Sequence, residues 1–233
     1  MRYKLTDSTA FPVAEISLSK GETVQIESGS MIYHNGNVKL EGKSNSSGGG
    51  IGGLLKAAVR SAVTGESMFI THVTGLTDNA MVAIAPNAPG AIRELELAPG
   101  RQFRIRDQAF LACDGTTAYQ VKKQSLGKAL FGGTGGLFIM ETTGTGSMLV
   151  NSYGDIIEFT LDGSKPFVVD NNHVVAWSTT LDYNIKVASG TFGFTSGEGL
   201  VNEFNGSGTI LIQTRNVESL AGLIKPFLPN SSG

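Results

Sequence analysis

Residues 15–36, EISLSKGETVQIESGSMIYHNG, decide the fold because the chain carries two further copies of this stretch. Without a gap it aligns with ELELAPGRQFRIRDQAFLACDG, which starts at Glu94, and with EFTLDGSKPFVVDNNHVVAWST, which starts at Glu158. The starting glutamates, Glu15, Glu94 and Glu158, are 79 and 64 residues apart. Repetition of this kind indicates a fold built from similar units that pack on one another.

Each copy predicts a hairpin of two strands followed by a third, more apolar strand. Apolar residues alternate in EISL, ELEL and EFTL and again in TVQI, QFRI and PFVV, at the period of two that half-buried strands show. The turns SKGE, APGR and DGSK each contain a glycine, which accepts the positive φ of a tight turn. The pieces SMIY, AFLA and HVVA are apolar at nearly every position, so we expect strands buried between layers.

A second block recurs later in each copy, as GESMFITHVTG, GTGGLFIMETTG and GEGLVNEFNG, and an apolar strand follows each time. The sequence therefore predicts an all-β fold of three sequential, pseudo-equivalent β units around a pseudo-threefold axis, with one short inserted helix. We place the repeats at about 13–92, 93–157 and 158–216 of a single compact domain, 1–233, with a C-terminal tail at 217–233. The tail predicts a second short helix that ends before Pro226.

The composition narrows the class of protein. Hydrophobic residues make up 40% of the chain, which suffices for a core, and the net charge of −2 lacks the basic surplus of nucleic-acid-binding proteins. One cysteine, Cys113, excludes an internal disulfide and suits a reducing compartment. The N-terminus lacks the apolar run of a signal peptide, and no stretch has the roughly 18 apolar residues of a spanning helix. We therefore expect a cytoplasmic protein.

The stretch GGGIGGLLKAAVRSAVTGES, residues 48–67, joins the two blocks of the first repeat. Apolar residues at helical spacing predict a short amphipathic helix at 51–63, with two cations on its polar side. The stretch departs from a phosphate-binding loop, G-x-x-x-x-G-K-[ST], because no Ser or Thr follows Lys56. The apolar stripe instead suits a protein partner or a membrane surface. The candidate interaction surface consists of Leu54, Leu55, Lys56, Val59 and Arg60.

Several motifs resemble one known family. LSKGETVQIESGSM, GGLLK with TGES, APNAPGAI, SYGDII, VVDNNHVVAW and IQTRN follow one another as in bacterial relatives of the "altered inheritance of mitochondria" protein, over essentially the whole chain. The resemblance implies a fold similar to that of the tryptophan RNA-binding attenuation protein (TRAP-like), a β-sandwich of the double-stranded β-helix type, used three times. It implies no activity, because the bacterial members have no assigned biochemistry. The mitochondrial relative is associated with the organisation of inner-membrane assemblies.

Two sets of equivalent residues raise the question of a metal site. His34, Cys113 and Trp177 occupy one position of the repeat, which favours core filling over a zinc site, because zinc needs three or four converging ligands. Glu15, Glu94 and Glu158 would form a carboxylate ring that binds a cation if the axis brought them together. The favoured alternative places each glutamate on the solvent face of an outer strand. We predict no cofactor, no metal and no catalytic residue.

The repeats favour a non-enzymatic scaffold or interaction protein that forms a homo-oligomer, since β units expose edges that self-associate. The alternative is a small-molecule or nucleic-acid binding protein that uses the Gly-rich loop near 44–53 as a lid. Nucleic acid is the weaker ligand, because the repeats lack a basic pair at equivalent positions. An enzyme would require a cluster of perturbed titratable groups, which the sequence does not place.

Overall fold

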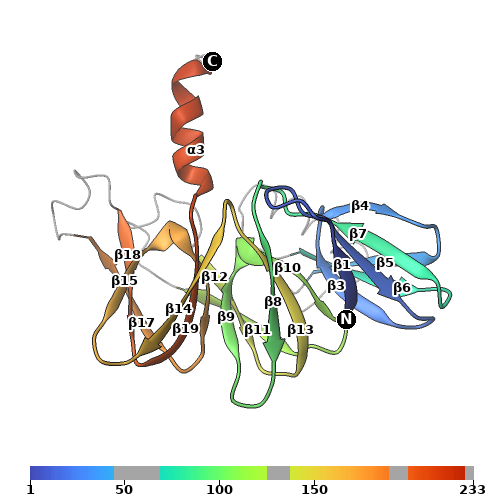
Figure 1. Cartoon of the computed structure of the whole chain (residues 1–233), viewed down its shortest axis with the longest axis horizontal. Helices are drawn as coiled ribbons and strands as arrows, with labels where there is room; N and C mark the ends of the chain where they lie inside the picture. The colour runs from blue at the N-terminus through green and yellow to red at the C-terminus, as the bar shows by residue number, and fades with distance from the viewer. Residues whose placement is uncertain (45–68, 125–136, 189–198, 229–233) are drawn as a thin grey trace.

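The computed structural model describes residues 1–44, 69–124, 137–188 and 199–228. Figure 1 shows antiparallel sheets that follow one another along the longest dimension, with the N-terminal strands at one end and the C-terminal sheet at the other. The predicted all-β fold is thus confirmed. The pseudo-threefold axis stays a prediction, as do the repeat boundaries.

A four-stranded sheet forms the N-terminal end of the molecule. Its strand order is β1-β2-β7-β4, and every neighbouring pair is antiparallel. The strands are β1 (Arg2–Leu5), β2 (Ala14–Leu18), β7 (Ala80–Ile84) and β4 (Met31–His34). Apart from β1, all of them come from the first predicted repeat.

Two six-stranded sheets follow, and each takes three strands from one repeat and three from the next. The first has the order β5-β6-β3-β10-β13-β8 and the second β11-β12-β9-β16-β19-β14. The strands of the first are β5 (Val38–Ser44), β6 (Phe69–Gly75), β3 (Thr23–Glu27), β10 (Phe110–Asp114), β13 (Gly146–Asn151) and β8 (Ile92–Leu97). Those of the second are β11 (Tyr119–Gln124), β12 (Leu137–Thr142), β9 (Phe103–Arg106), β16 (Val174–Ser178), β19 (Ser207–Gln213) and β14 (Ile156–Asp162).

The C-terminal sheet has three strands, in the order β15-β18-β17. These are β15 (Phe167–Asp170), β18 (Leu200–Asn205) and β17 (Asp182–Val187). The short 3-10 turns are η1 (Asp107–Ala109), η2 (Asn171–His173) and η4 (Lys225–Phe227). The helix α3 (Val217–Ile224) begins after Asn216, whose side chain accepts a hydrogen bond from the Ser219 N–H at 2.7 Å.

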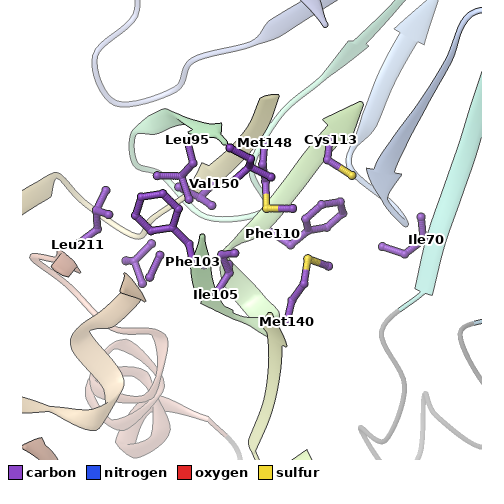
Figure 2. Packing of buried hydrophobic residues seen from close by; sticks show 14 residues of the cluster. Ile70, Leu95, Phe103, Ile105, Phe110, Cys113, Met140, Met148, Val150 and Leu211 are labelled. Carbon is purple, nitrogen blue, oxygen red and sulfur yellow. The ribbon is translucent and has the colours of Figure 1, made fainter. Parts of the chain in front are cut away.

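The core is continuous across the repeats, because the shared sheets carry apolar side chains from both neighbours. Figure 2 shows one cluster that joins Ile70 of the first repeat, Phe103, Phe110 and Met140 of the second, and Leu211 of the third. The alternation of apolar residues seen in the sequence produces these inward faces, with Leu95 and Leu97 of β8 buried and Glu96 exposed between them.

Most local predictions are confirmed. The turn glycines Gly21, Gly100 and Gly163 have φ of 79°, 79° and 82°, and the tail forms α3, which ends before Pro226. The burial of the third strand is confirmed for β10 and β16 but is wrong for β4, whose four residues are all exposed. The predicted helix at 51–63 lies outside the described residues.

Candidate functional site

Two strand pairings hold consecutive repeats together, and we call them joints. In the first joint β10 pairs with β3, so that Ala112 lies opposite Ile26 and Cys113 opposite Gln25. In the second joint β16 pairs with β9, with Ala176 opposite Ile105 and Trp177 opposite Arg104. Adding 79 or 64 to each residue number of the first joint gives the second, so the sequence offsets reproduce the register residue by residue.

The later strand of each joint, β10 or β16, has a β-bulge at the same repeat position. The register shifts between Phe110 and Ala112 in β10 and between Val174 and Ala176 in β16. The equivalent shift in β4 lies between Met31 and Tyr33. β4 therefore has the backbone form of a joint strand, with a bulge at the same position.

The joints bury the repeat position that holds a different residue in each copy. Trp177 is 1% exposed and packs edge-on against Tyr183 and Phe204, with ring centroids at 4.9 and 5.7 Å. Cys113 is fully buried, and burial raises the pKa of its thiol to about 12. His34, the third member, is exposed, so the prediction of core filling is wrong for this histidine. Its strand lies at the end of a sheet, where no further strand covers it.

In each joint, a tyrosine of the later repeat contacts a side chain of the preceding repeat. In the first joint the Tyr119 hydroxyl donates to Gln25 Oε1 at 2.8 Å. In the second joint the Arg104 guanidinium lies over the Tyr183 ring, 5.7 Å from its centroid. Tyr119 and Tyr183 are equivalent in the repeat, as are Gln25 and Arg104. The same two repeat positions are thus in contact in both joints, but the contact is a hydrogen bond in the first and a cation–π interaction in the second.

Arg104 also makes several polar contacts across the second joint. Its Nε donates to Glu141 Oε2 at 2.8 Å, and its Nη1 donates to the carbonyl oxygens of Thr179 and Leu181 at 3.3 and 3.0 Å. The Lys122 ammonium donates to Glu141 Oε1 at 2.7 Å. The hydrogen bond from Lys122, with that from Arg104, lowers the pKa of Glu141. This arrangement fixes the turn after β16 to the preceding repeat.

At each end of the molecule, a strand equivalent to a joint strand has one edge that pairs with none of the described strands. β4 is the terminal strand of the N-terminal sheet, and it exposes Met31, Ile32 (51%) and Tyr33. β15 is the terminal strand of the C-terminal sheet, and Val168 on it is 54% exposed. The Tyr33 hydroxyl donates to Glu15 Oε1 at 2.5 Å, and this hydrogen bond raises the pKa of Tyr33. Exposed apolar side chains on a sheet edge are typical of an interaction site.

Glu15, Glu94 and Glu158, weighed above as a carboxylate ring, make separate contacts. Glu15 accepts from Tyr33, Glu94 accepts from Tyr3 and Ser147, and Glu158 pairs with Arg93 at 3.7 Å. Within the described ranges, no three His, Cys, Asp or Glu side chains converge as a metal ion requires. Glu15 and Glu94 are half-buried and Glu158 is exposed, each on its own strand.

The surface predicted at Leu54, Leu55, Lys56, Val59 and Arg60 lies outside the described residues, as does the Gly-rich loop from residue 45 onward. None of the helices in the described part of the chain is long and apolar enough to cross a membrane. The helix α3 projects from the sheets in Figure 1 and exposes Leu223, and the turn η4 after it exposes Phe227. Sequence reasoning missed the two open edges, because the strings SMIY and AFLA have the same apolar character.

Comparisons with known proteins agree with this fold. A curated protein from Streptococcus pyogenes serotype M6, "Uncharacterized protein M6_Spy0233", is 48% identical over 233 residues, covering all of this chain and 93% of that protein. The crystal structure of protein SPYM3_0169 from Streptococcus pyogenes superposes with a TM-score of 0.80 at 43% identity, over 97% of this chain and 99% of that one. Neither relative carries a name that assigns an activity. The family model described as "Mitochondrial biogenesis AIM24" matches residues 3–215, and the chain therefore belongs to this family.

Proposed function

We propose that this protein is a non-enzymatic scaffold that assembles head to tail, with β4 of one copy paired to β15 of the next. The observation that carries the proposal is the division of the sheets. Each internal six-stranded sheet joins three strands of one repeat to three strands of the next, and each end of the molecule holds one unmatched half. Joining the C-terminal half to the N-terminal half restores the same strand order, β17-β18-β15-β4-β7-β2.

The internal joints supply a register for this pairing. Transferring the offsets places Tyr33 opposite Val169, His34 opposite Val168 and Asn35 opposite Phe167 of the neighbouring copy. The bulge in β4 already matches the bulges of β10 and β16. Antiparallel addition of a strand to an open edge satisfies backbone groups on both sides.

The side chains at the outer contact are complementary as well. The positions of the Tyr119–Gln25 and Tyr183–Arg104 pairs are held at the two ends by Leu40 and Val168. Leu40 is equivalent to the two tyrosines, and Val168 is equivalent to Gln25 and Arg104. Both are exposed hydrophobic residues, and the proposed pairing would bring them into contact. A hydrogen bond in the first joint and a cation–π contact in the second are thus followed by an apolar contact in the third. Bringing two exposed aliphatic side chains together is favourable, because it removes apolar surface from water.

The pairing must occur between copies. Figure 1 shows β4 and β15 at opposite ends of the long dimension, so one chain does not close on itself. A contact between two different surfaces of the same protein is heterologous, and it produces a ring when the rotation closes and a filament when it does not. Either form repeats every exposed surface, α3 included, at a fixed spacing. A partner with several binding modules then gains avidity without any new contact.

Disulfide trapping tests the pairing directly. Residues that face each other across antiparallel strands have Cβ atoms about 4.5–5.5 Å apart, close enough for a disulfide to form with a small adjustment. We expect His34→Cys with Val168→Cys to give a ladder of covalent multimers under mild oxidation. Asn184→Cys in place of Val168→Cys is the matched control, because Asn184 and Val168 lie on opposite sides of Glu203 in the same sheet. Native Cys113 is buried and does not compete.

Native mass spectrometry supplies the second measurement. We expect the wild-type protein at an integer multiple of the chain mass and Val168→Lys at the mass of one chain, since a lysine on the edge blocks strand addition. A wild-type protein that is monomeric at micromolar concentration, or a ladder that is equally strong with Asn184→Cys, contradicts head-to-tail assembly.

A further inference from the structure

The N-terminal strand fills a groove between the first two repeats. β1 pairs antiparallel with β2, with Tyr3 opposite Ile16 and Leu5 opposite Ala14. Met1, Tyr3 and Leu5 pack on the cluster that contains Ile16, Val24 and Leu149. The Tyr3 hydroxyl donates to Glu94 Oε2 at 2.8 Å, and burial together with this bond raises the pKa of Tyr3 to about 12. β1 is thus an extended segment whose alternate side chains occupy the groove.

The equivalent groove between the second and third repeats is open. A cavity of about 230 Å³ lies there, with Leu95, Phe103 and Leu211 among its apolar lining residues. Leu95 and Phe103 correspond to Ile16 and Val24 at the offset of 79. Leu211 corresponds to Leu149, because each is paired with the alanine that enters its joint. The same apolar residues are therefore present, but among the described strands none equivalent to β1 covers them.

The backbone beside this cavity presents a strand edge. β8 is the terminal strand of its six-stranded sheet, as β2 would be without β1. Residues 93–96 of β8 correspond to residues 14–17 of β2, which pair with residues 2–5. A groove with apolar residues at its floor and polar residues at its rim, next to an open strand edge, suits an extended peptide, which binds through main-chain hydrogen bonds and pockets for alternate side chains.

The charges around the two grooves differ at several positions, because Arg93, Glu96 and Arg101 correspond to Ala14, Ser17 and Glu22. In the filled groove, Arg2 lies opposite Ser17, and its Nη2 lies 3.3 Å from Glu22 Oε2. In the open groove Glu96 and Arg101 form an ion pair at 3.3 Å, so a ligand residue at the place of Arg2 would face both charges. Glu158, which lines the cavity, corresponds to Glu94, the acceptor for Tyr3.

We infer that the groove between the second and third repeats binds an extended peptide segment of a partner protein, added antiparallel to β8. The segment carries apolar side chains at alternate positions and a hydroxyl-bearing aromatic residue directed at Glu158. This binding site goes beyond the assembly proposed above, because it lies at an internal joint and does not involve β4 or β15. A monomeric protein has the site as well.

The probe is a fluorescent peptide with the sequence of residues 1–8, acetylated at its N-terminus and altered by R2E. Fluorescence anisotropy is measured on the full chain, wild type and Val168→Lys. We expect saturable binding to both, with an affinity within about threefold of that of the unaltered MRYKLTDS peptide, because residue 2 of the peptide would face both Glu96 and Arg101. A peptide with Tyr3 and Leu5 both replaced by Ser is expected to show no binding.

Two protein variants locate the binding site. Thr209→Trp fills the cavity, which Thr209 lines, and it should weaken binding at least about tenfold. Thr77→Trp, an exposed position in the first repeat, is the matched control and should leave binding unchanged. Glu158→Ala tests the hydroxyl contact without filling the groove, since it should weaken the R2E peptide but not its Tyr3→Phe form.

Several outcomes would overturn the inference. Lack of saturable binding up to about 1 mM peptide excludes an affinity of use to a partner segment. Binding that is insensitive to Thr209→Trp places the peptide elsewhere, for example on β2 in exchange for β1. Binding that is present in the wild type but absent in Val168→Lys assigns the peptide to the outer joints and leaves the internal groove without a ligand.

Discussion

The strands β10 and β4 occupy the same position in their repeats and share a bulge, yet one is buried and the other exposed. The first four residues of β10 are buried, because β3 of the preceding repeat covers its outer edge. β4 has β7 on one side, and none of the described strands lies on the other. The difference teaches that burial in this fold depends on the adjacent repeat rather than on the strand's own residues.

The same lesson applies to the other half of each joint. Gln25, Arg104 and Val168 are equivalent, and only the last stands at an open edge, where it is more than half exposed. The first two are polar and contact a tyrosine of the next repeat. The side chain at this position is therefore polar where a tyrosine of the following repeat contacts it.

Thiol reactivity gives the largest contrast between the two environments. In the Val168→Lys background, His34→Cys should react with a thiol reagent at the rate of a free cysteine. Cys113, whose pKa is raised from 9.0 to about 12, should react about a thousandfold more slowly. Stopped-flow labelling measures both rates. Comparable rates would show that the joint position is not shielded, and slow labelling of His34→Cys in the wild-type background alone would show that assembly shields it.

Truncation at the same repeat position should give a large difference in stability. Trp177→Ala removes a buried aromatic side chain and should lower the free energy of unfolding by about 3–5 kcal/mol. His34→Ala, tested in the Val168→Lys background, should change it by less than about 0.5 kcal/mol. Urea denaturation followed by far-UV circular dichroism measures both values. Equal losses in the two variants would contradict the distinction between joints and ends.

A smaller effect concerns the acid stability of the second joint. The pKa of Glu141 is lowered in the folded protein by its hydrogen bonds to Lys122 and Arg104. The stabilisation is therefore present above the unfolded carboxyl pKa of about 4.3 and is lost as the pH falls through the folded value. Between about pH 5 and about pH 2, the wild-type unfolding free energy should fall more steeply than that of Glu141→Gln.

The control for this measurement is Glu96→Gln, which removes an exposed carboxylate that contacts Arg101. Exposed ion pairs contribute little to stability, so its pH profile should follow that of the wild type. Identical profiles for all three proteins would mean that Glu141 does not stabilise the joint.

Much of this architecture could be predicted from residue patterns alone. Alternation in EISL, ELEL and EFTL identifies β2, β8 and β14, and the gap-free alignment predicts the register of both joints. The alignment does not say which repeat is covered, because Tyr33 and Ala112 occupy equivalent positions in strings of similar character. Exposure of β4 follows from its place as the terminal strand of its sheet, which is a property of the assembled sheet and not of the strand's own residues.

The groove was equally hard to anticipate. Residues 2–5, RYKL, alternate like a strand, and this signal would have placed β1 beside β2. The open groove can be recognised only when the groove beside β2, which β1 fills, is compared with the equivalent groove beside β8. The candidate surface at Leu54 and Leu55 stays a prediction, because it lies outside the described residues.

The sharing of each sheet between two repeats has a consequence for synthesis on the ribosome. Gln25 of β3 and Gly115, which follows β10, are 90 residues apart and meet in the finished first joint. At about 5–20 residues per second, the edge of β3 waits roughly 5–20 s for its partner strand to emerge. During that interval the nascent chain presents the same kind of unpaired edge that the mature protein keeps at β15, so we expect neighbouring chains on one polysome to be exposed to unwanted strand exchange.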